Sequence, residues 1–183
     1  MAGGAMAKSR DVELVLLAAE FAARKHRNQR RKDPDATPYI NHPLALARLL
    51  WTEGRVHDPV VIAAALLHDT IEDTRTTRAE LVRAFGREVA DVVAEVTDDK
   101  RLHKTTRKRL QIEHAPHLSR KAKLVKLADK TCNLRDVASN APAGWSLERQ
   151  RAYFEWAGQV VDGLRGTNAR LERAFDRAYR RRP

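Results

Sequence analysis

The chain has 183 residues and a formal net charge of +11 at pH 7, and 43% of its residues are hydrophobic. These values predict one globular domain with a substantial core and exclude a largely disordered chain. The single cysteine, Cys132, excludes a disulfide framework and indicates a reducing compartment. No apolar run reaches the roughly 18 residues of a membrane span, and Glu13 and Glu20 interrupt the apolar stretch near the N-terminus. We therefore expect a cytoplasmic protein with no membrane partner.

The excess of positive charge predicts a polyanionic partner. The segment RKHRNQRRK, residues 24–32, contains six Arg or Lys, and the chain ends in RRRP. Faces that bind nucleic acid usually combine basic with aromatic residues, but only 5% of residues are aromatic and none lies inside the basic segment. A small phosphorylated ligand accounts for the charge as well as nucleic acid does.

The first predicted helix begins at Ser9, whose side chain is a suitable N-cap, and its apolar residues repeat at helical spacing as far as Ala23. Residues 1–8 are expected to form a disordered lead, in which Met6 is a second candidate start. Residues 9–183 are assigned to the domain.

Capping residues, prolines and glycines mark the further helices. Predicted helices follow at residues 43–53, from residue 59 through the stretch VIAAALLHDTIEDT, and at residues 78–85, 87–97, 119–137, 146–161 and about 167–179. None of these helices includes residues 98–118. No stretch alternates with the period of a strand, and no repeat or long linker divides the chain. The sequence therefore predicts a single all-α domain.

The most hydrophobic run of the chain, residues 61–67, leads directly into His68, Asp69, Glu72 and Asp73. Burying such groups is unfavourable unless they are paired or bind a metal. On a continuous helix they would lie at its buried end, with Glu72 and Asp73 one turn beyond the first two. Three carboxylates so close together repel one another unless a cation or strong donors intervene. The stretch is either a helix end that reaches solvent or a metal site.

A second His-Asp pair, His57 and Asp58, has a simpler explanation. Asp58 precedes Pro59 and is well placed as an N-cap, and His57 is then a loop residue. We assign no site to this pair, because it neither follows a buried run nor precedes further carboxylates.

A metal site needs ligands from elsewhere in the chain, and Asp129 and His42 are the candidates. In LVKLADKTCNL, Asp129 lies beside the apolar stripe and should be half-buried. An ion pair with Lys126 or Lys130 is the alternative role for this carboxylate. His42 stands at a predicted helix start, where it could equally be an ordinary cap or core residue.

Three segments together are more specific than any one residue. NHPLALA, ALLHDTIEDT and KLADKTCNL resemble, in this order, the ligand-bearing segments of the HD phosphohydrolase superfamily. RRKDPDATPYINHP and VTDDK narrow the resemblance to the hydrolase domain of RelA/SpoT stringent-response enzymes. YFEWA and GTNARLE are similar to segments of the stand-alone small alarmone hydrolases, which include metazoan SpoT homologues. The resemblance covers residues 10–178 and implies an HD-domain helical bundle.

The resemblance also implies roles for individual residues. It implies one Mn²⁺, with iron and zinc as alternatives, bound by His42, His68, Asp69 and Asp129. Glu72 and Asp73 match the family's catalytic pair, which orients and deprotonates the attacking water. The implied substrate contacts are Arg31 and Lys32 at the guanine base, and Lys100, Lys104, Asn133, Arg149 and Tyr153 at the phosphates or ribose. A solvated basic face is the alternative for this last group.

The implied reaction removes the 3′-pyrophosphate of guanosine tetra- or pentaphosphate, (p)ppGpp, and gives GDP or GTP and pyrophosphate. The basic rim would neutralise the phosphates, which explains the net charge without nucleic acid and makes a nucleic-acid partner unnecessary. Since no synthetase domain follows, we expect the protein to degrade the alarmone and not to make it. Three alternatives remain. They are a related hydrolase that removes the 2′-phosphate of NADPH or acts on another nucleotide, a binding module without turnover, and a basic RNA-binding protein whose binding needs no metal and falls with salt.

Overall fold

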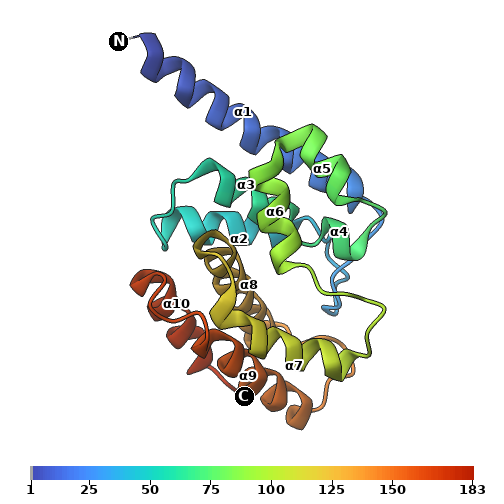
Figure 1. Ribbon diagram of the computed structural model, residues 1–183. Coiled ribbons are helices and arrows are strands. Elements are labelled where there is room, and N and C mark those ends of the chain that lie inside the picture. Colours follow the sequence, from blue (N-terminus) through green and yellow to red (C-terminus); the bar gives the residue numbers. More distant parts are fainter. Residues whose placement is uncertain (1) are drawn as a thin grey trace.

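The structure is a computed structural model that describes residues 2–183, with side chains from residue 9 onward. Its helices are α1 (Ala2–Lys25), α2 (Asn41–Thr52), α3 (Pro59–Leu67), α4 (Thr70–Asp73), α5 (Arg78–Phe85), α6 (Arg87–Val96), α7 (Lys104–His114), the 3-10 helix η1 (Ala115–His117), α8 (Arg120–Ser139), α9 (Leu147–Asp162) and α10 (Ala169–Tyr179). Among the described residues there is no strand beyond an isolated bridge between Arg30 and Pro38. The prediction of an all-α fold is confirmed (Figure 1).

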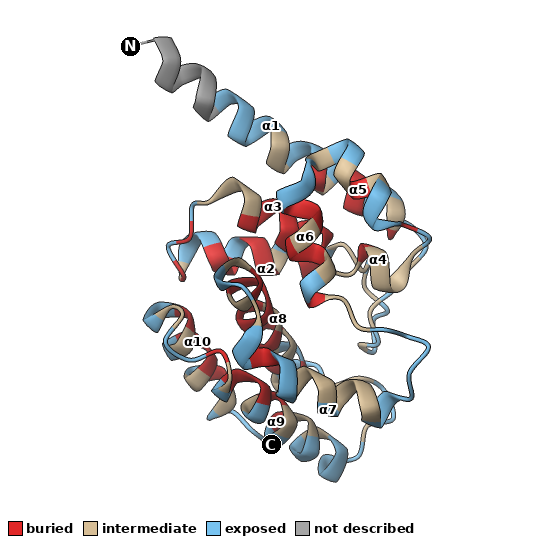
Figure 2. Cartoon of the chain, in the orientation of Figure 1, coloured by how far each residue is buried: buried red, intermediate tan, exposed pale blue. Residues whose placement is uncertain are grey.

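Helix α3 forms the centre of the core. Every residue from Val61 to Leu67 is buried, and the helix packs against α1, α2, α6 and α8. Figure 2 shows this burial around α3, on α6 and along α8. Because α3 is covered on all sides, its sequence is apolar throughout and shows no polar face. In the described part of the chain, no helix combines the length and the apolar character that crossing a membrane requires.

Side-chain N-caps are present at four later helices. Asp58, Thr77, Ser119 and Ser146 each accept a hydrogen bond from a backbone N–H two or three residues further on. Such bonds satisfy amide groups that have no partner inside the helix. The starts of α3, α5, α8 and α9 are therefore fixed by single side chains.

The predicted start of the first helix at Ser9 is wrong, because α1 is already helical from Ala2. A serine caps a helix only where the residues before it are not helical. Here the residues before Ser9 already belong to the helix. The division into a lead of residues 1–8 and a domain of residues 9–183 stays a prediction, because the side chains of the first eight residues lie outside the described part.

Helix α7 was not predicted. Its sequence, KTTRKRLQIEH, contains no fully buried residue, so it lacks the apolar stripe that marks a helix in sequence. The helix packs against α9, and the Trp156 indole N–H donates to the Lys108 carbonyl at 3.0 Å. Tertiary contacts place this helix, and its own residue pattern does not reveal it.

Asn168 joins the C-terminal helix to the end of α2. Its Oδ1 accepts hydrogen bonds from the backbone N–H groups of Arg170 and Leu171, and its Nδ2 donates to the Gly54 carbonyl, all at 3.0 Å. Asn168→Ala should lower the free energy of unfolding by about 1–2 kcal/mol, since it removes both the cap and the tether. Urea unfolding measures this. Asn168→Ser, which keeps a capping oxygen but is too short to reach Gly54, should lose less. An alanine variant as stable as wild type would contradict the role.

Candidate metal and phosphate site

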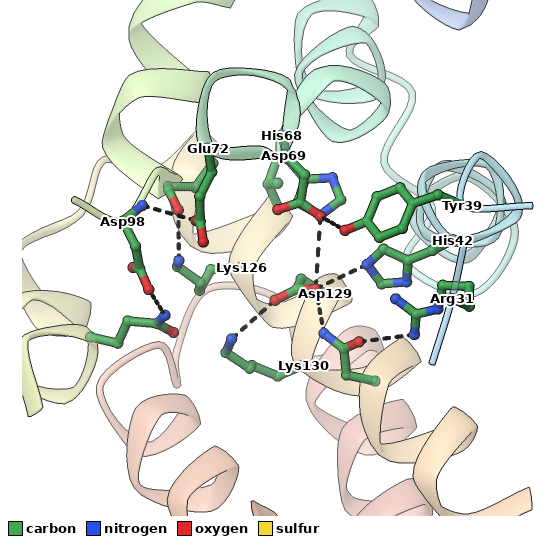
Figure 3. A pocket seen from close by; sticks show the side chains of 14 residues that line it. Arg31, Tyr39, His42, His68, Asp69, Glu72, Asp98, Lys126, Asp129 and Lys130 are labelled. Carbon is green, nitrogen blue, oxygen red and sulfur yellow. Dashed lines mark hydrogen bonds and ion pairs between the residues drawn. The ribbon is translucent and has the colours of Figure 1, made fainter. Parts of the chain in front are cut away.

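The chain bends at His68 and Asp69, between α3 and α4. The prediction of one continuous helix through these residues is wrong, because α3 ends at Leu67 and α4 begins at Thr70. The Thr70 hydroxyl donates to the Leu67 carbonyl at 2.6 Å and so replaces a backbone partner at the bend. The bend places both His68 and Asp69 at a turn that faces α2 and α8 (Figure 3).

Four predicted ligands from three segments lie together at this turn. One ring nitrogen each of His42 and His68 and one carboxylate oxygen of Asp69 lie within 4.8 Å of one another. Asp129 Oδ1, on α8, is 3.2 Å from His42 Nε2 and 3.9 Å from His68 Nε2. Two imidazoles and two carboxylates are a ligand set that suits a divalent transition metal.

The hydrogen bonding of His68 favours a cation at its second nitrogen. His68 is 5% exposed, and its Nδ1 lies 2.8 Å from the Ala65 carbonyl, to which it must donate. In the neutral ring Nε2 then carries a lone pair. Asp69 Oδ2 lies 2.8 Å from Nε2, yet Nε2 forms no hydrogen bond of good geometry with the described residues. Burial lowers the pKa of His68, but the charges of Asp69 and Asp129 outweigh it and raise the pKa to about 9. A proton or a metal ion is needed at this position, so the residues fit a bound divalent ion.

Asp129 is held from several sides. Its Oδ1 accepts a hydrogen bond from Asn133 Nδ2 at 2.6 Å, and its Oδ2 lies 3.0 Å from Lys130 Nζ. Burial alone would raise the pKa of Asp129, but Lys130 and the two histidines hold it well below its usual value. The ion pair with Lys130, which was the alternative role for this carboxylate, therefore exists together with its approach to the histidines.

Tyr39 is a site residue that the sequence did not single out. Its hydroxyl donates to Asp69 Oδ2, and its ring lies against those of His26 and His42. Burial and the charge of Asp69 raise the pKa of Tyr39, which keeps it a donor. Its place in the segment TPYINHP was the available signal. Tyr39 fixes one oxygen of Asp69 and leaves the carboxylate oriented toward the cluster.

The two carboxylates of α4 point to different surroundings. Glu72 lines the pocket, where its Oε2 accepts from the Asp98 backbone N–H at 3.1 Å and its Oε1 is 3.4 Å from Arg107 Nη1. Burial, followed by nearby acidic groups, raises the pKa of Glu72. Asp73 is not among the lining residues; it accepts from Gln29 Nε2 at 2.8 Å and pairs with Lys100. Of the predicted catalytic pair, Glu72 alone faces the cavity.

The pocket over this cluster has a volume of about 160 Å³. It is lined by Arg31, Tyr39, His42, His68, Asp69, Glu72, Val96, Asp98, Gln111, Val125, Lys126, Asp129, Lys130 and Asn133. All four predicted ligands line it, as do Glu72 and two of the predicted substrate contacts, Arg31 and Asn133.

The other predicted substrate contacts lie outside this lining. They are Lys32, Lys100, Lys104, Arg149 and Tyr153. Lys100 is paired with Asp73, and the Arg149 guanidinium lies 4.4 Å from the centre of the Trp145 ring. Burial raises the pKa of Tyr153 to about 12. A role for these residues requires a ligand that extends beyond the described cavity.

The second His-Asp pair lies at the opposite end of α3. Asp58 caps this helix and lies 2.6 Å from Lys121 Nζ, and the His57 ring lies 4.3 Å from that of Trp51. The nine residues of α3 lie between the two pairs and separate Asp58 from His68 by about 15 Å along the helix. The predicted capping role of Asp58 is confirmed.

Comparison with known proteins gives concordant results. The profile of the HD domain matches residues 18–155. Guanosine-3′,5′-bis(diphosphate) 3′-pyrophosphohydrolase MESH1 of Xenopus tropicalis is 60% identical over 171 residues, covering 93% of this chain and 96% of that protein. The Homo sapiens protein of the same name is 60% identical over 168 residues, covering 92% and 94%. A solved structure described as a metazoan ortholog of SpoT that hydrolyzes ppGpp and plays a role in starvation responses has a TM-score of 0.90 at 51% identity, covering 92% and 95%.

Proposed function

Because the chain belongs to the HD-domain family, and because two of its histidines and two of its aspartates lie in one buried cluster, we propose that it is a guanosine-3′,5′-bis(diphosphate) 3′-pyrophosphohydrolase. It removes pyrophosphate from (p)ppGpp and leaves GDP or GTP. The observation that carries this function is 60% identity, over 93% of the chain, to a protein named for that activity. The cluster of histidines and aspartates that lines the pocket supports the proposal, because it is a suitable ligand set for a divalent metal ion.

The proposed metal ligands are His42, His68, Asp69 and Asp129. A divalent ion held by these residues would polarise the phosphoryl group and would make the attacking water more acidic. Within this class we propose Mn²⁺, because mixed imidazole and carboxylate ligands suit it, with iron and zinc as alternatives. The lone pair of His68 Nε2 beside two carboxylates supports the assignment.

Glu72 is the proposed general base. It accepts a proton from the attacking water, whose oxygen forms a bond to the phosphorus next to O3′. The bond from this phosphorus to O3′ breaks, O3′ keeps the electron pair and takes up a proton, and pyrophosphate leaves. The Asp98 N–H and Arg107 hold the Glu72 carboxylate in place for this step. A catalytic role for Asp73, which lies next to Glu72 but outside the lining, stays a prediction.

The pH dependence of turnover follows from the burial of Glu72. A base must be deprotonated, and the pKa of Glu72 is raised. Activity should therefore fall on the acid side at a higher pH than the value of about 4.3 for an ordinary glutamate. A profile of kcat against pH, with bound metal measured at each point, tests this. An acid limb at or below the ordinary value, with metal retained, would exclude Glu72 as the base.

Arg31 is the proposed contact to the guanine base. Its guanidinium is held by Asp136 at 2.5 Å and by Asn133 at 3.3 Å, and it lies 5.7 Å from the centre of the Tyr39 ring. Arg31→Ala should raise KM more than it lowers kcat, because a stacking contact acts on bound substrate and transition state alike. Arg31→Lys should rescue poorly, since an ammonium group has no planar face. Steady-state kinetics on ppGpp measures both, and a lysine variant that matches wild type would reduce the role to charge.

The partner is a small nucleotide, and no nucleic acid is needed to explain the basic rim. The buried single cysteine fits a reducing compartment, so we propose a cytoplasmic location. The direct test incubates the Mn²⁺-loaded protein with ppGpp and, separately, with NADPH. We expect pyrophosphate from ppGpp. Phosphate from NADPH with no product from ppGpp would instead support the 2′-phosphatase alternative.

A further inference from the structure

Lys126 is a buried lysine that the proposed reaction has not yet used. It is 8% exposed and stands on α8 three residues before Asp129, so both side chains lie on one face of the helix. It lines the pocket together with Glu72 and Asp129, and Figure 3 shows its ammonium group beside Glu72. A cation therefore forms part of the wall between the proposed base and the metal ligands.

The protein provides a hydrogen-bond acceptor for only part of the donor capacity of this ammonium group. Lys126 Nζ donates to the Val96 carbonyl, at the end of α6, at 2.8 Å. An ammonium group carries three hydrogens to donate. Among the described residues it forms no ion pair with a carboxylate, although Asp98, Asp129 and Glu72 are close enough to affect its charge. By contrast, Lys130 on the same helix is paired with Asp129 at 3.0 Å.

A buried ammonium group with unused hydrogen-bond donors would be stabilised by an anion. Burial, together with the charge of Lys130, lowers the pKa of Lys126, as expected for a buried amine that has a carbonyl and no carboxylate as its hydrogen-bond partner. An oxyanion in the pocket would accept the spare hydrogens and form charge-assisted hydrogen bonds. The other cations near the cluster are each paired with a carboxylate, Lys130 with Asp129, Arg107 with Glu72 and Arg31 with Asp136.

We propose that Lys126 is a further catalytic residue, whose ammonium group binds the non-bridging oxygens of the pyrophosphate that is removed. This inference rests on the proposed function. As the attacking water loses its proton to Glu72, negative charge grows on these phosphoryl oxygens, and Lys126 stabilises it. The Val96 carbonyl orients the ammonium group before substrate arrives.

A purely structural role gives different expectations. The Val96 carbonyl lies in the last turn of α6, where carbonyl groups have no partner inside the helix, and Lys126 could act only as their cap. Loss of the cap would lower the midpoint of thermal unfolding. It would leave pyrophosphate binding and the kcat of the folded protein unchanged.

Lys126→Met tests the proposal, with Lys123→Met as the matched control on the same helix. The measurements are pyrophosphate affinity by calorimetry on the Mn²⁺-loaded protein, metal content, the thermal midpoint, and kcat on ppGpp. Lys126→Met should weaken pyrophosphate binding at least about tenfold, the low end for a hydrogen bond to a charged group. It should lower kcat of the folded protein about 10²- to 10³-fold, with metal content unchanged, whether or not loss of the bond to the Val96 carbonyl lowers the midpoint. Lys123→Met should match wild type throughout.

A lowered midpoint with unchanged pyrophosphate affinity and kcat would overturn the proposal. If Lys126→Met does not fold, the wild-type protein decides. With ¹³C-labelled lysine, and Mg²⁺ in place of paramagnetic Mn²⁺, the Lys126 signal, assigned by its loss in Lys126→Arg, should shift on addition of pyrophosphate. An unchanged signal would overturn the role. If wild type binds pyrophosphate through Lys126 but does not hydrolyse ppGpp, the proposed function fails and the phosphate-binding role stands.

Discussion

Asp69→Ala is expected to leave the protein without bound metal and without measurable hydrolysis of ppGpp. Asp69 contributes a carboxylate oxygen to the cluster with His42 and His68. Its loss also removes the acceptor of the Tyr39 hydroxyl. Activity should fall by more than the 10- to 100-fold typical of residues that only support metal ligands. Elemental analysis and steady-state kinetics measure the two effects.

Asp58→Ala is the matched control, because it makes the same change in the second His-Asp pair. It should lower the free energy of unfolding by about 1 kcal/mol through loss of the α3 cap. Metal content and the kcat of the folded protein should remain at wild-type level, and His57→Ala should behave in the same way. Equal loss of metal in Asp58→Ala and Asp69→Ala would show that the cluster at the bend is not the metal site.

Glu72→Gln should reduce kcat at least about a hundredfold while the protein keeps its metal. Glutamine retains the size of the side chain and an oxygen that can accept from the Asp98 N–H, but it cannot accept the proton of the attacking water. Glu72 is not among the proposed ligands His42, His68, Asp69 and Asp129, so we expect the metal to remain bound. The measurement combines metal content with kinetics on ppGpp.

The control is Glu88→Gln, an exposed glutamate that pairs with Lys121 away from the pocket. It should match wild type in both measurements. If Glu72→Gln is free of metal, Glu72 is a ligand and its assignment as base is wrong. If it is metal-replete and fully active, another group accepts the proton. Asp73→Asn, tested beside it, decides whether a carboxylate outside the pocket lining also contributes to kcat.

Local signals in the sequence predicted most of the fold. Side-chain caps such as Thr77 and Ser146 act within one turn of their own position, so their pattern identifies helix starts without tertiary information. Helix α7 was not predicted because its sequence has no apolar stripe. Contacts with α9 hold this helix in place. The start of α1 was misplaced because a capping residue also occurs inside a continuing helix.

The sequence singled out the residues of the site but did not predict their arrangement in space. A histidine and carboxylates that follow a buried run indicated that His68 and Asp69 were unusual, and the structure brings them next to His42 and Asp129. The bend at His68 and Asp69 was not predictable, because the Thr70 hydroxyl that bonds to the Leu67 carbonyl leaves no periodic signal in the sequence. Asp73, which lies outside the pocket lining, is held by contacts with Gln29 and Lys100 that the sequence does not reveal.

The distance along the chain between the clustered residues has a consequence for folding. His42 and Asp129 are 87 positions apart, so an ion held between them closes a long loop and cross-links α2 to α8. A ligand that binds only the folded state stabilises it by about 2.7 kcal/mol at a hundred times its dissociation constant. The ion would therefore stabilise the folded state in addition to its role in the reaction. A cell short of metal would lose active sites and would also expose more of the unfolded chain to proteases.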